Sequence, residues 1–72
     1  MPATLTTDVG DQARSALQES PIYDLRHLQV ERQNETLLIS GRVSTFYHKQ
    51  LAQEVVRAVS GRTRVINSVE VG

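Results

Sequence analysis

The sequence has 72 residues, with eight basic and eight acidic side chains, no cysteine and 39% hydrophobic residues. These values fit one small domain with a thin core, and they exclude a disulfide framework, a thiolate metal site and a disordered chain. Zero formal charge argues against a nucleic-acid-binding domain, because such domains are usually basic. Seven of the eight basic residues are arginine, which makes bidentate contacts to carboxylate or phosphate.

The chain is expected to begin with a flexible arm over residues 1–7, followed by a single domain over residues 8–72. A short first helix is predicted from apolar residues at helical spacing, namely Val9, Ala13, Ala16 and Leu17. Thr7 is predicted as its N-cap residue. The Ser20-Pro21 step ends it, because proline disfavours helical backbone in the preceding residue.

The N-terminal residues carry neither the basic nor the apolar region of a signal peptide. No apolar run approaches the length of a transmembrane helix. We therefore expect a soluble protein that is cytoplasmic as given, or periplasmic if a signal has been removed.

Two alternating segments predict an antiparallel hairpin. The residues expected to face the core are Leu28 and Val30 in the first strand and Leu37, Ile39, Gly41 and Val43 in the second, with His27 on the outer face. Residues 33–35 are predicted to form the turn, with Asn34 in the left-handed conformation that asparagine tolerates.

A stronger helix is predicted from Phe46 to Ser60, capped by Ser44 or Thr45 and ended by Gly61. Its apolar arc contains Tyr47, Leu51, Ala52, Val55, Val56, Ala58 and Val59. A last strand is predicted over residues 65–71, with Val65, Asn67, Val69 and Val71 facing inward. The order of elements predicts an α+β fold of the type αββαβ, in which two helices cover one face of a three-stranded mixed sheet.

A set of motif residues occurs in a fixed order along the chain, namely Leu37-Leu38-Ile39-Ser40-Gly41-Arg42-Val43, then Ala52, Val59 and Gly61, then Val65-Ile66-Asn67 and Val71. Through these residues the chain resembles a BON domain, the module named for bacterial OsmY and nodulation proteins. Three positions depart from the family pattern. Glu35 replaces the usual hairpin glycine, while Arg32 and Arg62 replace apolar residues. The two arginines either thin the core or mark a surface adapted to a partner.

The resemblance implies a non-catalytic module that binds phospholipid membranes or other proteins, often in envelope-stress or osmotic-shock proteins. Gly41, Gly61 and Asn67 are interpreted as structural, with Gly41 allowing close approach of a helix and Asn67 bonding to backbone near the crossover. No cofactor is expected. A metal site at His27 and His48 is disfavoured, because the ligand set would be incomplete.

The candidate binding residues are Arg57, Arg62 and Arg64 around the end of the second helix, with Tyr47 as a weaker candidate. Arginine near a helix C-terminus also stabilises the helix dipole, which is the competing structural interpretation. The functional hypothesis is a site for an anionic membrane surface or a protein partner, in a monomer or weak homo-oligomer.

Two alternatives remain open. One is self-association through the open sheet face, where Leu38 and Ile66 lie among polar residues. The weaker one is nucleic-acid binding through residues 61–64, which lack an accompanying aromatic platform.

Overall fold

The computed structural model describes residues 8–72, so the expected arm over residues 1–7, including Thr7, lies outside the described part. The helices are α1 (Val9–Gln18), α2 (Tyr23–Arg26) and α3 (Phe46–Ser60). The strands are β1 (Gln29–Gln33), β2 (Thr36–Ser40), β3 (Arg42–Val43), β4 (Arg64–Asn67) and β5 (Glu70–Val71).

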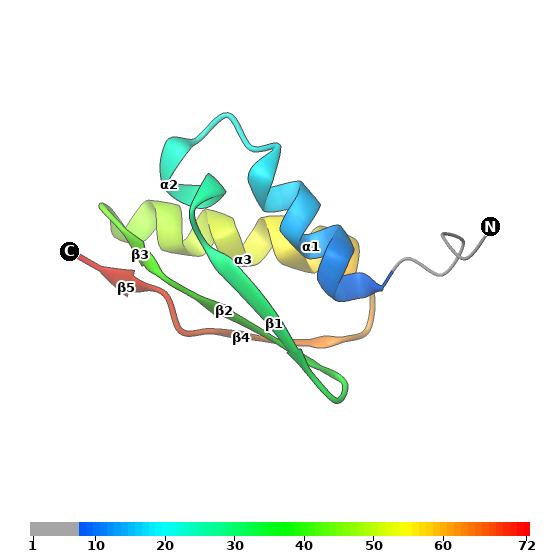
Figure 1. Ribbon diagram of the computed structural model, residues 1–72. Coiled ribbons are helices and arrows are strands. Elements are labelled where there is room, and N and C mark those ends of the chain that lie inside the picture. Colours follow the sequence, from blue (N-terminus) through cyan, green and yellow to red (C-terminus); the bar gives the residue numbers. More distant parts are fainter. Residues whose placement is uncertain (1–7) are drawn as a thin grey trace.

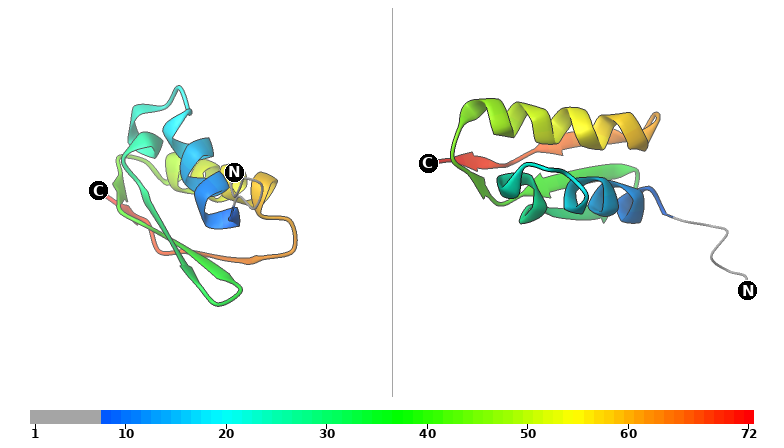
Figure 2. Two further views of the ribbon diagram at one scale, coloured as in Figure 1. Left: turned by 45° about the vertical axis from the view of Figure 1, so that its right-hand side comes forward. Right: turned by 90° about the horizontal axis from the view of Figure 1, so that it is seen from above.

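The sheet is mixed, with the strand order β1-β2-β4. β1 and β2 form the predicted antiparallel hairpin, and β4 pairs parallel to β2 after the crossover through α3. β3 follows β2 and β5 follows β4, and these two short strands form a second parallel pair. Figure 1 shows the helices on one side of the sheet, and Figure 2 shows α1 and α3 side by side, α1 towards β1 and α3 towards β4. The predicted α+β arrangement is confirmed.

The core fills the space between the helices and the inner face of the sheet. Its largest fully buried side chains are Leu17, Leu25, Leu37, Ile39, Val43, Val56 and Val69. These residues come from the helices and from the sheet, so one core buries both the inward residues of the strands and the apolar stripes of the helices. In two places the predicted inward pattern is wrong: Tyr47 and Ala58 on α3, and Val71 on β5, are exposed.

Helix α2 was not predicted. Its four residues are too few to show a helical period, yet Leu25 within it is completely buried. The preceding turn is held by the Ser20 hydroxyl, which accepts a hydrogen bond from the backbone N–H of Ile22 at 3.1 Å. His27 follows as the C-cap residue of α2, so its predicted place on the outer sheet face is wrong.

The second and last strands are each interrupted at the same level of the sheet. Gly41 separates β2 from β3, while Ser68 and Val69 separate β4 from β5. The two interruptions are joined by the Ser68 N–H, which donates to the Ile39 carbonyl at 2.8 Å, and by the Glu70 N–H, which donates to the Gly41 carbonyl at 2.9 Å. The prediction of one continuous strand from Val65 to Val71 is therefore wrong, because the segment from β4 to β5 bends here together with the segment from β2 to β3.

Gly41 has a φ of 130°, and a Cβ atom there would lie 2.8 Å from Cδ2 of Leu28. The close neighbour is thus a side chain leading into β1, which corrects the expectation that a helix approaches this glycine. Two other backbone predictions are confirmed, since Asn34 and Gly61 have φ values of 58° and 62°.

The start of each long helix is held differently. Asp8, rather than Thr7, occupies the N-cap position of α1, and its carboxylate forms an ion pair with Arg32 instead of capping the helix. For α3 the cap is Thr45, whose hydroxyl accepts a hydrogen bond from the His48 N–H at 3.0 Å. This settles the choice between Ser44 and Thr45.

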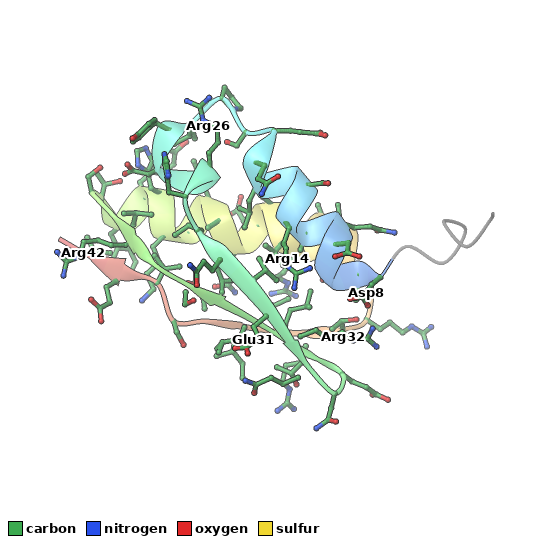
Figure 3. The ribbon with its side chains drawn as sticks, in the orientation of Figure 1. Asp8, Arg14, Arg26, Glu31, Arg32 and Arg42 are labelled. Atoms are coloured by element: carbon green, nitrogen blue, oxygen red, sulfur yellow. The ribbon has the colours of Figure 1, made fainter. Side chains whose placement is uncertain are left out.

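The β1 edge of the sheet is partly covered by a side chain of α1. Arg14, labelled in Figure 3, donates through Nε to the Val30 carbonyl at 3.0 Å. Its guanidinium also pairs with Asp11 at 2.6 Å. Another strand adding to this edge would compete with Arg14 for the Val30 carbonyl.

Candidate functional site

Three arginines gather where α3 ends and β4 begins. They line one surface hollow, called here the arginine hollow, formed by Arg57, Gly61, Arg62, Thr63, Arg64 and Val65. All three arginine side chains are exposed, and within residues 8–72 none of them forms an ion pair. The structure thus brings together the three arginines that the sequence singles out.

The backbone of the hollow is fixed by short-range contacts. Gly61 turns the chain out of α3, and the Thr63 N–H donates to the Ser60 carbonyl at 3.0 Å. The Arg64 N–H then donates to the Glu35 carbonyl at 3.3 Å, at the end of the hairpin turn. The loop therefore presents its guanidinium groups from an ordered backbone.

The electrostatics of the hollow are dominated by these side chains. Three guanidinium charges outweigh the C-terminal end of the α3 dipole, which is equivalent to roughly half a negative charge. Arginine remains charged at any physiological pH and binds phosphate oxygens in a bidentate manner. The arrangement suits an anionic ligand of the phosphate type.

Tyr47 lies away from the arginine hollow. It is in the first turn of α3, ten residues before Arg57, which corresponds to about 15 Å along the helix. Its side chain is 65% exposed and lies against the His48 ring. The structure therefore does not join Tyr47 to the arginines in one compact site.

The aromatic residues of the chain lie instead at the start of α2 and at the start of α3. All three phenylalanine and tyrosine side chains are exposed, namely Tyr23, Phe46 and Tyr47. A cation lies over two of the rings: Arg26 is 5.6 Å from the Tyr23 centroid, and Lys49 is 6.0 Å from that of Phe46. Sequence analysis missed the place of Tyr23, because it depends on α2.

A second hollow follows one side of α3 and links the two ends of the helix. Its lining, called here the α3 flank, is Phe46, Lys49, Gln50, Gln53, Glu54, Arg57 and Asn67. Phe46 and Arg57 are eleven residues apart, or about three helical turns, so they lie on the same stripe of the helix. Arg57 belongs to both hollows, which makes the α3 flank continuous with the arginine hollow.

The two arginines that depart from the family pattern have different surroundings. Arg32 pairs with Asp8 at the start of α1 and donates through Nε to the Asn34 carbonyl at 3.0 Å (Figure 3). It therefore ties the hairpin to α1. Arg62 lies in the arginine hollow without such a tie among the described residues.

Asp24, Ser44 and His48 meet between α2 and α3, but not as a catalytic triad. The Ser44 hydroxyl donates to Oδ2 of Asp24 at 2.6 Å, and His48 Nδ1 lies 3.0 Å from the same oxygen. In a nucleophilic triad the hydroxyl bonds to the imidazole, whereas here both groups bond to the carboxylate. The cluster thus joins α2 to the start of α3.

This cluster lowers the pKa of Asp24 from 3.8 to about 2, chiefly through hydrogen bonds from the Ser44 hydroxyl and backbone N–H and then through His48. Because the carboxylate is favoured in the folded state, the cluster contributes stability above the unfolded-state pKa, and this contribution is lost as the pH falls towards 2.

We expect Asp24→Asn to unfold at a lower temperature than the wild type at about pH 7, and the difference to narrow between about pH 4 and pH 2. Thermal unfolding followed by circular dichroism measures this. Glu19→Gln is the matched control, because it removes an exposed carboxylate that forms no ion pair among residues 8–72, with the same change of charge. A constant difference between Asp24→Asn and the wild type across this range would contradict the assigned role of Asp24.

The outer face of the sheet is not covered by a helix (Figure 2). Leu38 and Ile66 are adjacent on it, since they are register partners between β2 and β4, and Ile66 is 45% exposed. The predicted apolar pair on the open face is therefore present, although it is small.

None of the helices within residues 8–72 is long and apolar enough to cross a membrane. The same residues contain no group of three or more histidine, cysteine, aspartate or glutamate side chains arranged to hold a metal ion.

Together these features define a small α+β domain with charged surface hollows and a continuous core. A comparison with protein families matches the BON domain to residues 6–72, nearly the whole chain. The protein belongs to the BON domain family, whose members are generally non-catalytic binding modules. No curated protein matches the sequence.

Proposed function

We propose that this BON domain is a non-catalytic module that binds an anionic phospholipid surface, with lipid phosphates in the arginine hollow. The observation that carries the proposal is the meeting of Arg57, Arg62 and Arg64 at one hollow without ion-pair partners among residues 8–72. Family membership supports it, because BON domains often bind phospholipids, frequently in stress proteins. The same family relationship supports a proposed role in envelope or osmotic stress.

The expected affinity is modest. Each basic side chain near an anionic membrane contributes about 1 kcal/mol, and this contribution falls off within a Debye length. Three arginines therefore give reversible binding that weakens as salt is added. A guanidinium already held by a carboxylate, as Arg42 is by Glu70, has less to offer a lipid.

Arg62→Gln should weaken binding to anionic vesicles about fivefold, which corresponds to the loss of about 1 kcal/mol. Arg42→Gln removes the same charge from another exposed side chain and should change binding less than twofold. Co-sedimentation with vesicles of phosphatidylglycerol and phosphatidylcholine, compared with phosphatidylcholine alone at low and moderate salt, measures both. Equal, negligible binding of the wild type to the two vesicles would exclude the proposal.

A second candidate function is self-association through the open sheet face, supported by the adjacent Leu38 and Ile66. Ile66→Lys should then abolish a concentration-dependent rise in mass measured by light scattering. A wild-type mass that stays monomeric to about millimolar concentration would remove this candidate. The nucleic-acid alternative has less support, because the lining of the arginine hollow includes no aromatic ring on which a base would stack.

A further inference from the structure

Phe46 and the arginine hollow lie at opposite ends of one side of α3. Phe46 is 70% exposed and lines the α3 flank together with Arg57, three turns further along the helix. Arg57 in turn lines the arginine hollow with Arg62 and Arg64. A flat surface laid along this side of α3 would therefore meet an aromatic ring at one end and three arginines at the other.

We infer that the domain docks on a membrane with α3 parallel to the bilayer, so that Phe46 enters the interfacial region while the arginine hollow meets the headgroup phosphates. This inference rests on the proposed function and adds the orientation and an aromatic anchor. The combination of chemistry commits it to a lipid surface, because an exposed aromatic ring gains by entering the acyl boundary and guanidinium groups gain at anionic headgroups, while the apolar arc of α3 stays in the core.

The surroundings of Phe46 agree with this role. Its ring is largely solvent-exposed and has Lys49 over it, and the lysine amine can stay at headgroup level while its stem lies along the ring. Tyr23 is equally an exposed aromatic residue with a cation over its ring, but it belongs to α2 and does not line the α3 flank. It is therefore a matched control for Phe46.

One residue of the flank opposes the inferred orientation. Glu54 is exposed and lines the same hollow as Phe46 and Arg57, so it would face the anionic lipids. Neutralising it should strengthen binding only if this side of α3 approaches the membrane. Glu19, the exposed C-cap residue of α1, provides a substitution with the same change of charge away from the flank.

The test uses vesicles of phosphatidylglycerol and phosphatidylcholine and the full chain. Phe46→Ala should weaken co-sedimentation about fivefold and Tyr23→Ala less than twofold, because only Phe46 leaves water on binding. Glu54→Gln should strengthen binding about threefold, and Glu19→Gln should leave it within a factor of two. The emission of Phe46→Trp should shift to shorter wavelength on addition of anionic vesicles.

The outcomes separate the two proposals. If the wild type binds and Arg62→Gln weakens it, while Phe46→Ala and Glu54→Gln behave as their controls, the inferred orientation is wrong and the proposed function stands. If the wild type binds neither anionic nor neutral vesicles, the proposed function itself fails. Circular dichroism of each variant confirms that the exposed substitutions leave the fold intact.

Discussion

Replacing Asn67 with leucine is expected to lower the free energy of unfolding by about 3 kcal/mol. The half-buried amide makes three hydrogen bonds. Its Nδ2 donates to the Lys49 carbonyl at 2.8 Å and to Gln53 Oε1 at 3.3 Å, and its Oδ1 accepts from the Val69 N–H at 3.1 Å. Leucine has a similar volume but leaves these partners without their bonds, in a region where water has restricted access.

The magnitude matters because the domain is small. A single core of this size rarely supplies more than about 3–5 kcal/mol of net stability, so Asn67→Leu should leave a large unfolded fraction at room temperature. Urea denaturation followed by circular dichroism measures the loss. Asn67→Asp retains the acceptor for Val69 but turns a carboxylate oxygen toward the Lys49 carbonyl, so it should also be less stable than the wild type.

A difference below about 0.5 kcal/mol between Asn67→Leu and the wild type would show that Asn67 does not join α3 to the bend between β4 and β5. The bend would then need another explanation. Asn67 would then have no structural role, and its position in the lining of the α3 flank would be the remaining clue to its role.

Gly41→Val is expected to cost about 3 kcal/mol, through two independent effects. Its φ of 130° lies in a region that side-chain-bearing residues rarely adopt. In addition, the new Cβ would lie 2.8 Å from Leu28 Cδ2, so the Leu28 side chain would have to shift, whereas Leu28 Cα at 3.5 Å would stay in ordinary contact.

Gly61→Ala provides the comparison for Gly41→Val. Gly61 also has a positive φ, of 62°, but a Cβ there would meet no atom within 4 Å. We expect this change to cost about 2 kcal/mol, the penalty for the backbone conformation alone, because a φ of 62° with a ψ of −119° is readily adopted only by glycine. Equal losses for the two variants in urea denaturation would mean that the contact with Leu28 contributes nothing.

Much of the fold could be predicted because its signals are local. Asn34 identifies the hairpin turn, and the apolar spacing from Phe46 to Ser60 identifies α3 with accurate ends. The missed features are those that depend on tertiary contacts. α2 is only four residues long and is held by burial of Leu25. The bends at Gly41 and Ser68 arise from hydrogen bonds between segments that are distant in sequence.

The candidate site also contains features that local sequence predicts and features that it does not. Arg57, Arg62 and Arg64 are close in sequence around a helix end, so their meeting in one hollow follows from local structure. Tyr47 shares a helix with Arg57, but a helix of 15 residues separates its two ends by about 20 Å. The place of Tyr23 beside the start of α3 depends on how α2 packs on α3, which no spacing pattern reports.

The two unusual arginines show why composition alone does not assign a role. Replacement of apolar residues by arginine was compatible with a thinner core or with a partner surface. Arg32 has a structural role, because it forms an ion pair with Asp8 and donates a hydrogen bond to the Asn34 carbonyl. Arg62 remains the residue through which the proposal of anion binding is most directly tested, because it lines the arginine hollow.

The most direct measurement is the change in backbone amide chemical shifts when the ¹⁵N-labelled protein is titrated with phosphatidylglycerol-containing nanodiscs. We predict changes and line broadening for residues 46–57 along the exposed side of α3 and for residues 61–65 of the arginine hollow, with none on β1 or α1. Changes confined to α1 or to the open sheet face, or no changes at low salt, would contradict the assignment of this surface as the membrane-binding face.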